Sequence, residues 1–447
     1  MSGLRVFKTG VVAVLATLAG CGGSSGGATG TTYTIGGAVL GLNAGGTVVA
    51  VLGTVNLSLT SNGPFTFPVP IADNTNYTVS IGTMPTGQSC GVFNETGTIS
   101  SANVTNVGVY CTDNVSAGTL DGTYEIGAFN INNDTAQLYS AVPFDGSGTQ
   151  GSSTVITNQA GTTFTTSTDD GGPYTVTTAE ALPVLTVGTN NAGAIAGADG
   201  DEFYWIDGTV NGGTSPALVV GVKPLQTTSL STLAGNWITV GLTQAATPYA
   251  FEGTLAIGAD GSFTGNESTL DFTLAAATQP VSGPAGSYSV ANNVVSIGGD
   301  SGYVSANGEF AILTSVTQQA GGASANYPNI TAAVKEGSGV TLATLNGVYS
   351  LGFMGYASAS TGDGSTLTLF FDGLGDFSGT VSANNNGSFS SGSVAGTYTV
   401  TSTGVLTLTD SNGDVFTGGV SADGNIVVAA YLTANAAAPD ILVGFRQ

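Results

Sequence analysis

The sequence predicts an all-β protein, in which an N-terminal β-sandwich is followed by three tandem antiparallel eight-stranded up-and-down β-barrels. Thr, Val and Tyr, which favour strands, are interspersed with regularly spaced Gly, Asn and Asp, which favour turns. Beyond the N-terminal leader, no stretch of about 12 residues keeps a helical periodicity. One ordered set of landmarks also recurs three times, about 112 residues apart, which is long enough for each repeat to be a domain.

Composition limits the classes of function. With 41 % hydrophobic residues the chain can form cores, so extended disorder is excluded. Only 5 Lys and Arg stand against 28 Asp and Glu, a net charge of −23. Such a surface repels phosphate backbones, so no nucleic-acid partner is expected. The absence of histidine from the sequence removes most metal and triad arrangements, so we expect no catalytic residues, no metal and no cofactor.

Residues 1–20 have the features of a secretory signal peptide. A short basic segment with Arg5 and Lys8 precedes an apolar stretch from about Val11 to Leu18, which is too short to span a bilayer. The leader ends in Leu-Ala-Gly followed by Cys21, which resembles the lipobox of bacterial lipoproteins. That resemblance implies cleavage before Cys21, acylation of this cysteine and anchoring to a membrane.

Residues 21–30 follow the lipobox as a Gly/Ser-rich tether that is expected to be flexible. Gly22, rather than Asp, comes directly after Cys21. By resemblance to Gram-negative lipoproteins, this implies sorting to the outer membrane, on its periplasmic or its cell-surface side.

Residues 31–113 are predicted to form one β-sandwich module. Cys90 and Cys111 are the two cysteines left in an exported chain, which favours a disulfide between them. The stretches around Tyr33, Phe65 and Tyr77, together with the two cysteines, resemble a small module of proteobacterial lipoproteins and secreted proteins. The resemblance implies an immunoglobulin-like or prealbumin-like sandwich and no particular chemistry.

The three repeats are predicted to span residues 118–225, 231–336 and 343–447. Each contains a Leu-x-Gly-x-aromatic opening, a hairpin turn, a strand with a central tyrosine, a second turn, and a last strand with a basic residue near its end. The openings are Leu120-Gly122-Tyr124, Leu233-Gly235-Trp237 and Leu345-Gly347-Tyr349, and the central tyrosines are Tyr174, Tyr288 and Tyr398.

The third repeat gives the clearest strand pattern. Eight candidate strands are joined by short Gly, Asn and Asp turns, which favours sequential antiparallel pairing. Apolar residues alternate with threonines, as in Leu406 and Leu408 against Thr407 and Thr409, so one face of the sheet is expected to be apolar and the other wet. A meander of this kind removes its edges by closing into a barrel.

Three basic residues remain outside the leader, and each occupies the same place in its repeat. Lys223, Lys335 and Arg446 follow the opening aromatics Tyr124, Trp237 and Tyr349 by 99, 98 and 97 residues. The Gly-Asn-Trp opening and basic ending resemble the calycin barrels, which include lipocalins and avidin-like proteins. The resemblance implies that Trp237 meets Lys335 at a closed barrel end, with Tyr124–Lys223 and Tyr349–Arg446 as tyrosine versions of the pair.

Acidic clusters are the remaining candidates for a catalytic or metal-binding site. They are Asp169 with Asp170, Asp199 with Asp201 and Glu202, and Asp363 with Asp372 and Asp376. Most of these residues lie beside glycine in hairpin turns, where Asp is favoured by its backbone preferences. We therefore expect turn residues rather than a carboxylate pair for glycoside hydrolysis or a calcium site.

These features predict a non-catalytic outer-membrane lipoprotein with a role in cell-envelope structure or surface recognition. One alternative is a carrier of small apolar ligands inside a lipocalin-like barrel, although eight strands favour an interior filled by side chains. Another is an accessory protein that binds polysaccharide. The sequence leaves open whether the partner, besides the membrane, is a protein, a glycan or a small apolar ligand.

Overall fold

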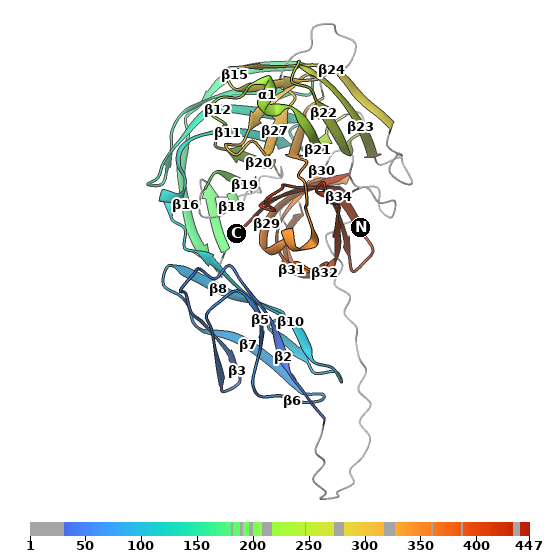
Figure 1. Cartoon of the computed structure of the whole chain (residues 1–447). Coiled ribbons are helices and arrows are strands. Elements are labelled where there is room, and N and C mark those ends of the chain that lie inside the picture. Colours follow the sequence, from blue (N-terminus) through green and yellow to red (C-terminus); the bar gives the residue numbers. More distant parts are fainter. Residues whose placement is uncertain are drawn as a thin grey trace, which may run out of the picture. The chain divides into compact units, whose positions relative to one another are not determined.

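The computed structural model confirms the all-β class (Figure 1). It describes residues 31–179, 182–187, 191–195, 200–207, 217–245, 247–271, 281–316, 327–358, 361–385, 388–431 and 439–447. Cys21, the expected signal peptide and tether, and Asp199 lie outside these ranges. Among the described residues, no helix is long and apolar enough to cross a membrane. The described chain forms two compact units, residues 31–112 and 113–447.

The N-terminal unit is a sandwich of two four-stranded sheets around one apolar core, which includes Ile35, Val48, Val79 and Val107. One sheet has the order β5 (Gly63–Thr66), β2 (Ile35–Leu40), β10 (Val104–Asp113), β8 (Gln88–Phe93). The other has the order β4 (Val55–Leu59), β3 (Val48–Leu52), β7 (Asn76–Thr83), β9 (Thr96–Thr98). β1 (Thr32–Tyr33) pairs with β6 (Ile71–Ala72), and β2 runs parallel to β10.

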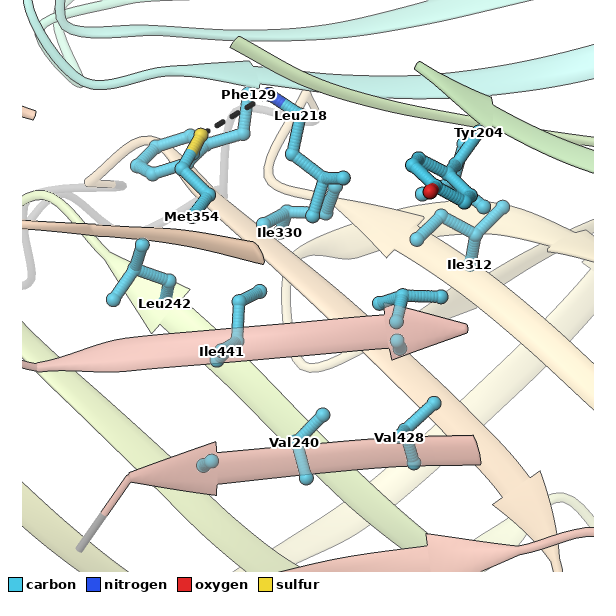
Figure 2. Close-up of a cluster of buried hydrophobic side chains, with 14 of the residues drawn as sticks. Phe129, Tyr204, Leu218, Val240, Leu242, Ile312, Ile330, Met354, Val428 and Ile441 are labelled. Carbon is cyan, nitrogen blue, oxygen red and sulfur yellow. Dashed lines mark hydrogen bonds between the residues drawn. The ribbon is translucent and has the colours of Figure 1, made fainter. Parts of the chain in front are cut away.

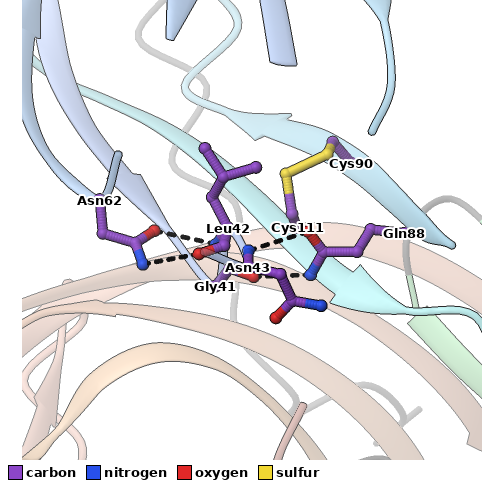
Figure 3. The surroundings of a disulfide bond; sticks show 7 residues. All are labelled: Gly41, Leu42, Asn43, Asn62, Gln88, Cys90 and Cys111. Atoms are coloured by element: carbon purple, nitrogen blue, oxygen red, sulfur yellow. Dashed lines mark hydrogen bonds between the residues drawn. A yellow bond between two sulfur atoms is a disulfide. The ribbon is translucent and has the colours of Figure 1, made fainter. Parts of the chain in front are cut away.

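A disulfide joins the neighbouring strands β8 and β10, as the cysteine count predicts (Figure 3). The Cα atoms of Cys90 and Cys111 are 4.0 Å apart, across a sequence separation of 21 residues. Closing a loop of this length stabilises the sandwich by roughly 3 kcal/mol. Beside the disulfide, the Gln88 amide donates to the Gly41 carbonyl (2.8 Å) and accepts from the Asn43 amide (3.0 Å), which fixes the chain after β2.

The second and third barrels are closed eight-stranded meanders in which the last strand pairs with the first. The second consists of β21 (Gly235–Thr243), β22 (Tyr249–Ile257), β23 (Ser262–Asp271), β24 (Val281–Ala291), β25 (Val294–Ile297), β26 (Asp300–Val304), β27 (Phe310–Thr314) and β28 (Asn329–Lys335). The third consists of β29 (Asn346–Ser358), β30 (Thr361–Asp372), β31 (Asp376–Asn385), β32 (Ser388–Val400), β33 (Val405–Asp410), β34 (Val415–Val420), β35 (Ile426–Tyr431) and β36 (Asp440–Arg446).

The first barrel is nearly closed. Its strands are β11 (Asp121–Asn130), β12 (Thr135–Asp145), β13 (Thr149–Gln150), β14 (Ser153–Gln159), β15 (Thr163–Asp169), β16 (Gly172–Ala179), β17 (Leu182–Val187), β18 (Asn191–Ile195), β19 (Glu202–Asp207) and β20 (Ala217–Val222). The pairs Gln150–Gly172 and Ser153–Asp169 have the same antiparallel register. β13 and β14 are therefore two parts of one strand of the meander, and β15 and β16 are two parts of the next strand, each interrupted by a bend. Gly171, at φ +71°, supplies one bend, and a Cβ there would lie 2.2 Å from the Gln150 carbonyl oxygen.

The three barrels share one apolar core, so the solvent-exposed outer face that the threonine pattern predicts does not extend around each barrel. We call this cluster the central core; the outward side chains of strands from all three barrels form it (Figure 2). Its members include Phe129, Leu138, Tyr204, Leu218, Val220, Ile238, Val240, Leu242, Ile312, Ile330, Met354, Val428, Ile441 and Val443. Strands at the centre, such as β20 and β35, are therefore buried on both faces.

Hydrogen bonds between barrels accompany the central core. The Tyr204 hydroxyl of the first barrel lies 2.9 Å from Ser350 Oγ of the third, and Tyr303 of the second lies 2.8 Å from Ser140 Oγ of the first. Burial raises the pKa of Glu125 to about 7, against the smaller lowering effects of its hydrogen bonds with the Ala141 amide and with Tyr303. Because buried polar groups need matched partners, these contacts favour one arrangement of the three barrels.

Candidate functional site

Each barrel has a basic side chain over the aromatic ring of its first strand. The distances from cation to ring centroid are 5.5 Å for Lys223 over Tyr124, 5.7 Å for Lys335 over Trp237 and 5.5 Å for Arg446 over Tyr349. Trp237 and Lys335 are direct cross-strand partners, as are Tyr349 and Arg446. The structure thus brings together each of the three pairs that the calycin resemblance implies.

Two of the cations also bond to the chain that enters their barrel. Lys335 Nζ donates to the Thr232 carbonyl at 3.0 Å, and Arg446 donates to the Thr344 carbonyl at 2.8 Å. Lys335 is only half-buried, so its cation–π contact contributes about 0.5–1 kcal/mol. These pairs stabilise one end of each barrel.

The glycine of each opening motif makes room for the cation. Gly122, Gly235 and Gly347 all have positive φ, at 126°, 132° and 142°. A Cβ on Gly235 would lie 3.1 Å from Lys335 Cε. The motif therefore needs glycine for its backbone conformation, and in the second barrel also because a Cβ would crowd the lysine side chain.

The repeated central tyrosines complete the closed ends, a role that sequence reasoning missed. Their hydroxyls donate to carbonyls of the short turns before the first strands, namely Tyr174 to Leu120 (2.8 Å), Tyr288 to Leu230 (2.9 Å) and Tyr398 to Leu345 (2.8 Å). The recurrence of a tyrosine at the same place in all three repeats is the sequence pattern that could have predicted this role. These hydrogen bonds therefore close the same end of each barrel.

The second barrel contains a cavity of about 310 Å³. Trp237 and Leu233 lie at its sealed end. Inward-facing side chains form its apolar wall. They belong to Phe251, Leu255, Ile257, Phe263, Val295, Val304, Ala311, Leu313 and Ala333. Phe251, Leu255 and Ile257 are only half-buried although they point inward, because they border this empty space. The expectation of a filled interior is wrong for this barrel.

The opposite end of the same cavity is polar. Asn329 Nδ2 donates to Asp300 Oδ1 at 3.0 Å, and Glu267 and Thr331 also line the space. Asn329 Oδ1 and Thr331 Oγ1 are buried and have no hydrogen-bond partner. Burial raises the pKa of Asp300 to about 6, against the weaker opposing effect of the Asn329 hydrogen bond, and it raises the pKa of Glu267 too. Unpaired buried acceptors are costly unless something binds to them.

The first barrel has a larger cavity, of about 570 Å³, beside its interrupted strands. Gln150, Asp169 and Gly171 border it at the bend, and Trp205 lines its wall. The Trp205 ring stacks on Phe203 with centroids 5.5 Å apart. Its neighbour Tyr204 points the other way, into the central core, so only one of these two adjacent aromatics faces a cavity.

The acidic residues Asp201 and Asp372, which the sequence groups in two clusters, take part in an ion pair and in a turn. Asp201 forms an ion pair with Lys223 at 3.1 Å, and Asp372 Oδ1 accepts from three backbone amides of its own turn. Burial raises the pKa of Asp363, in the third barrel, to about 6. Within the described ranges no three His, Cys, Asp or Glu side chains are grouped so that they could hold a metal ion.

No protein-family model and no curated relative matches this chain. Among solved structures, transferrin-binding protein B of Neisseria meningitidis serogroup B is 12 % identical, covering 70 % of this chain and 66 % of its own, with a TM-score of 0.27. A variant of transferrin-binding protein B from Haemophilus parasuis is 10 % identical, covering 91 % and 95 %, with a TM-score of 0.25. Kievitone hydratase of Nectria haematococca is 10 % identical, covering 51 % and 93 %, with a TM-score of 0.19. At these scores the matches assign neither a family nor a partner.

Proposed function

We propose that this chain is a non-catalytic outer-membrane lipoprotein that binds a small ligand inside its second barrel. The observation that carries this proposal is the cavity of about 310 Å³, which has an apolar wall and unpartnered polar atoms at one end. Its volume is at the lower end of the range for small-molecule sites, and convergent polar groups in an apolar pocket are typical of them. Asp201 and Asp372 serve an ion pair and a turn, which supports binding rather than catalysis.

Binding can be tested by native mass spectrometry of the mature chain. We expect a population heavier than the polypeptide by the mass of one small molecule, and we expect the variant Ala333→Leu, which fills the cavity, to lose it. A bare mass for the parent chain, and no stabilisation by any compound in a small-molecule thermal-shift screen, would contradict the proposal. Those results would favour the structural, surface-recognition or polysaccharide-binding alternatives.

The membrane anchor is a separate part of the proposal and rests on the lipobox resemblance at Cys21. Without the thiol no diacylglycerol can be attached, so Cys21→Ser should move the protein from the membrane fraction to the soluble one. The measurement is fractionation of cells expressing either form, with Cys90→Ser and Cys111→Ser together as the control that leaves Cys21 intact. Retention of the Cys21→Ser protein on membranes would refute the anchor.

A further inference from the structure

We propose that the ligand of the second barrel is a small organic cation, an ammonium group carried on a short apolar body. This inference rests on the proposed binding function and specifies the chemistry of the same cavity. It follows from the hydrogen-bonding groups at the polar end, from the placement of positive charge in the chain, and from the apolar wall.

The polar end of the cavity presents acceptors. One N–H of the Asn329 amide donates to Asp300, and the Oδ1 atom of the same amide is buried and unpaired. Thr331, 7 % exposed, also lines the cavity with an unpartnered Oγ1. With the carboxylates of Asp300 and Glu267, four side chains from β23, β26 and β28 offer oxygen atoms to one space. An ammonium group has three N–H donors and no acceptor, so it matches this arrangement.

The protein supplies no cation of its own at this end. In the described ranges the basic residues are Lys223, Lys335 and Arg446, and each is held over an aromatic ring at a barrel end. Lys335, in the same barrel, is bonded to the Thr232 carbonyl beside the seal. Asp300 and Glu267 therefore have no basic partner in this cavity. A bound ammonium would compensate the buried negative charge, whereas a carboxylate ligand would add to it.

The rest of the cavity determines the size and polarity of the group that carries the ammonium. Phe251, Leu255 and Leu313 form an apolar wall that could not solvate a bare inorganic ion. The volume of about 310 Å³ suits a single ring or a short chain rather than a lipid. The net charge of −23 would also draw cations toward the protein.

The test compares three probes that share one ring and differ in the head group: phenethylamine, phenethyl alcohol and hydrocinnamate. Calorimetric titration uses the full mature chain made soluble by Cys21→Ser. We expect the amine to bind roughly tenfold more tightly than the alcohol or better, because hydrogen bonds to charged groups are the strongest ones available, and we expect hydrocinnamate not to bind.

Asp300→Asn keeps the shape of the side chain and removes its charge. It should weaken amine binding roughly tenfold and alcohol binding by less, because only the amine loses an oppositely charged partner. Asp363→Asn is the matched control, since it neutralises a buried carboxyl of the third barrel, and it should change neither affinity. The melting temperature of each variant shows whether the fold is retained.

Protonation provides a second readout that does not depend on a variant. Lowering the pH from about 7 to about 5 protonates Asp300, whose pKa is about 6, while the amine stays charged. Amine affinity should therefore fall, and alcohol affinity should fall by less. Glu267 from β23 and Tyr249 from β22 also line this space, and Glu267 titrates in the same direction because burial raises its pKa.

The outcomes separate the inference from the function on which it rests. Equal binding of the amine and the alcohol, or an unchanged amine affinity in Asp300→Asn, would overturn the cation inference and leave a neutral-ligand binding protein. If none of the three probes binds and the native mass is bare, the binding function itself fails.

Discussion

Replacing Leu218 with alanine is expected to destabilise all three barrels together, by about 3–5 kcal/mol. Leu218 lies on β20 of the first barrel, is 0 % exposed and belongs to the central core. Its backbone amide lies 3.1 Å from Met354 Sδ of the third barrel (Figure 2). The side chain therefore stabilises contacts between barrels rather than the interior of one barrel, and its loss leaves a cavity where they meet.

Differential scanning calorimetry of the mature chain checks this prediction. The barrels should unfold in one transition that shifts as a whole in Leu218→Ala, while the transition of the N-terminal sandwich stays in place. Leu374→Ala is the matched control, because Leu374 is 82 % exposed and its truncation should cost less than about 0.5 kcal/mol. Three separate barrel transitions, of which only one moves, would show that the central core does not couple the barrels.

Part of the central core could be predicted from the sequence. β33 alternates buried and half-buried residues, as expected of a sheet with one face toward a core. β20 and β35 are instead runs of apolar residues buried at every position, a pattern typical of strands covered on both faces. Such runs predict that something covers the outer face. They do not say what covers it, because that depends on contacts between repeats separated by more than a hundred residues.

The cavity of the second barrel was harder to predict. Alternation along β28 points the wrong way, because its more apolar face, with Ile330 and Val334, belongs to the central core rather than to the barrel interior. The space left between the inward side chains also depends on how their volumes add across eight strands. Asp300 follows two glycines and Asn329 follows a proline, so both resemble turn residues in the sequence. Only the strand registers show that their side chains meet inside the barrel, at the end opposite Trp237.

Trp237→Ala should destabilise the three-barrel unit by about 3–5 kcal/mol, and Lys335→Met by only about 0.5–1 kcal/mol. The Trp237 ring is 2 % exposed and forms the sealed end of the cavity. Its indole N–H donates to the Leu233 carbonyl at 2.8 Å, so truncation also leaves that acceptor unpaired. Lys335 is half-exposed, so water already weakens the contact between its ammonium group and the Trp237 ring. Removing the ammonium group should therefore cost little stability.

A double-mutant cycle on this pair, measured by urea unfolding, separates the ring–cation contact from the other interactions of each residue. If the ammonium is attracted to the indole face, the double variant should be more stable than the sum of the single losses predicts, by about 0.5–1 kcal/mol. Lys223→Met combined with Trp237→Ala is the control, because these residues belong to different barrels and should be additive. Additivity for Lys335 with Trp237 would mean that the lysine acts only through its bond to the Thr232 carbonyl, and that the recurring aromatic serves to fill the barrel end.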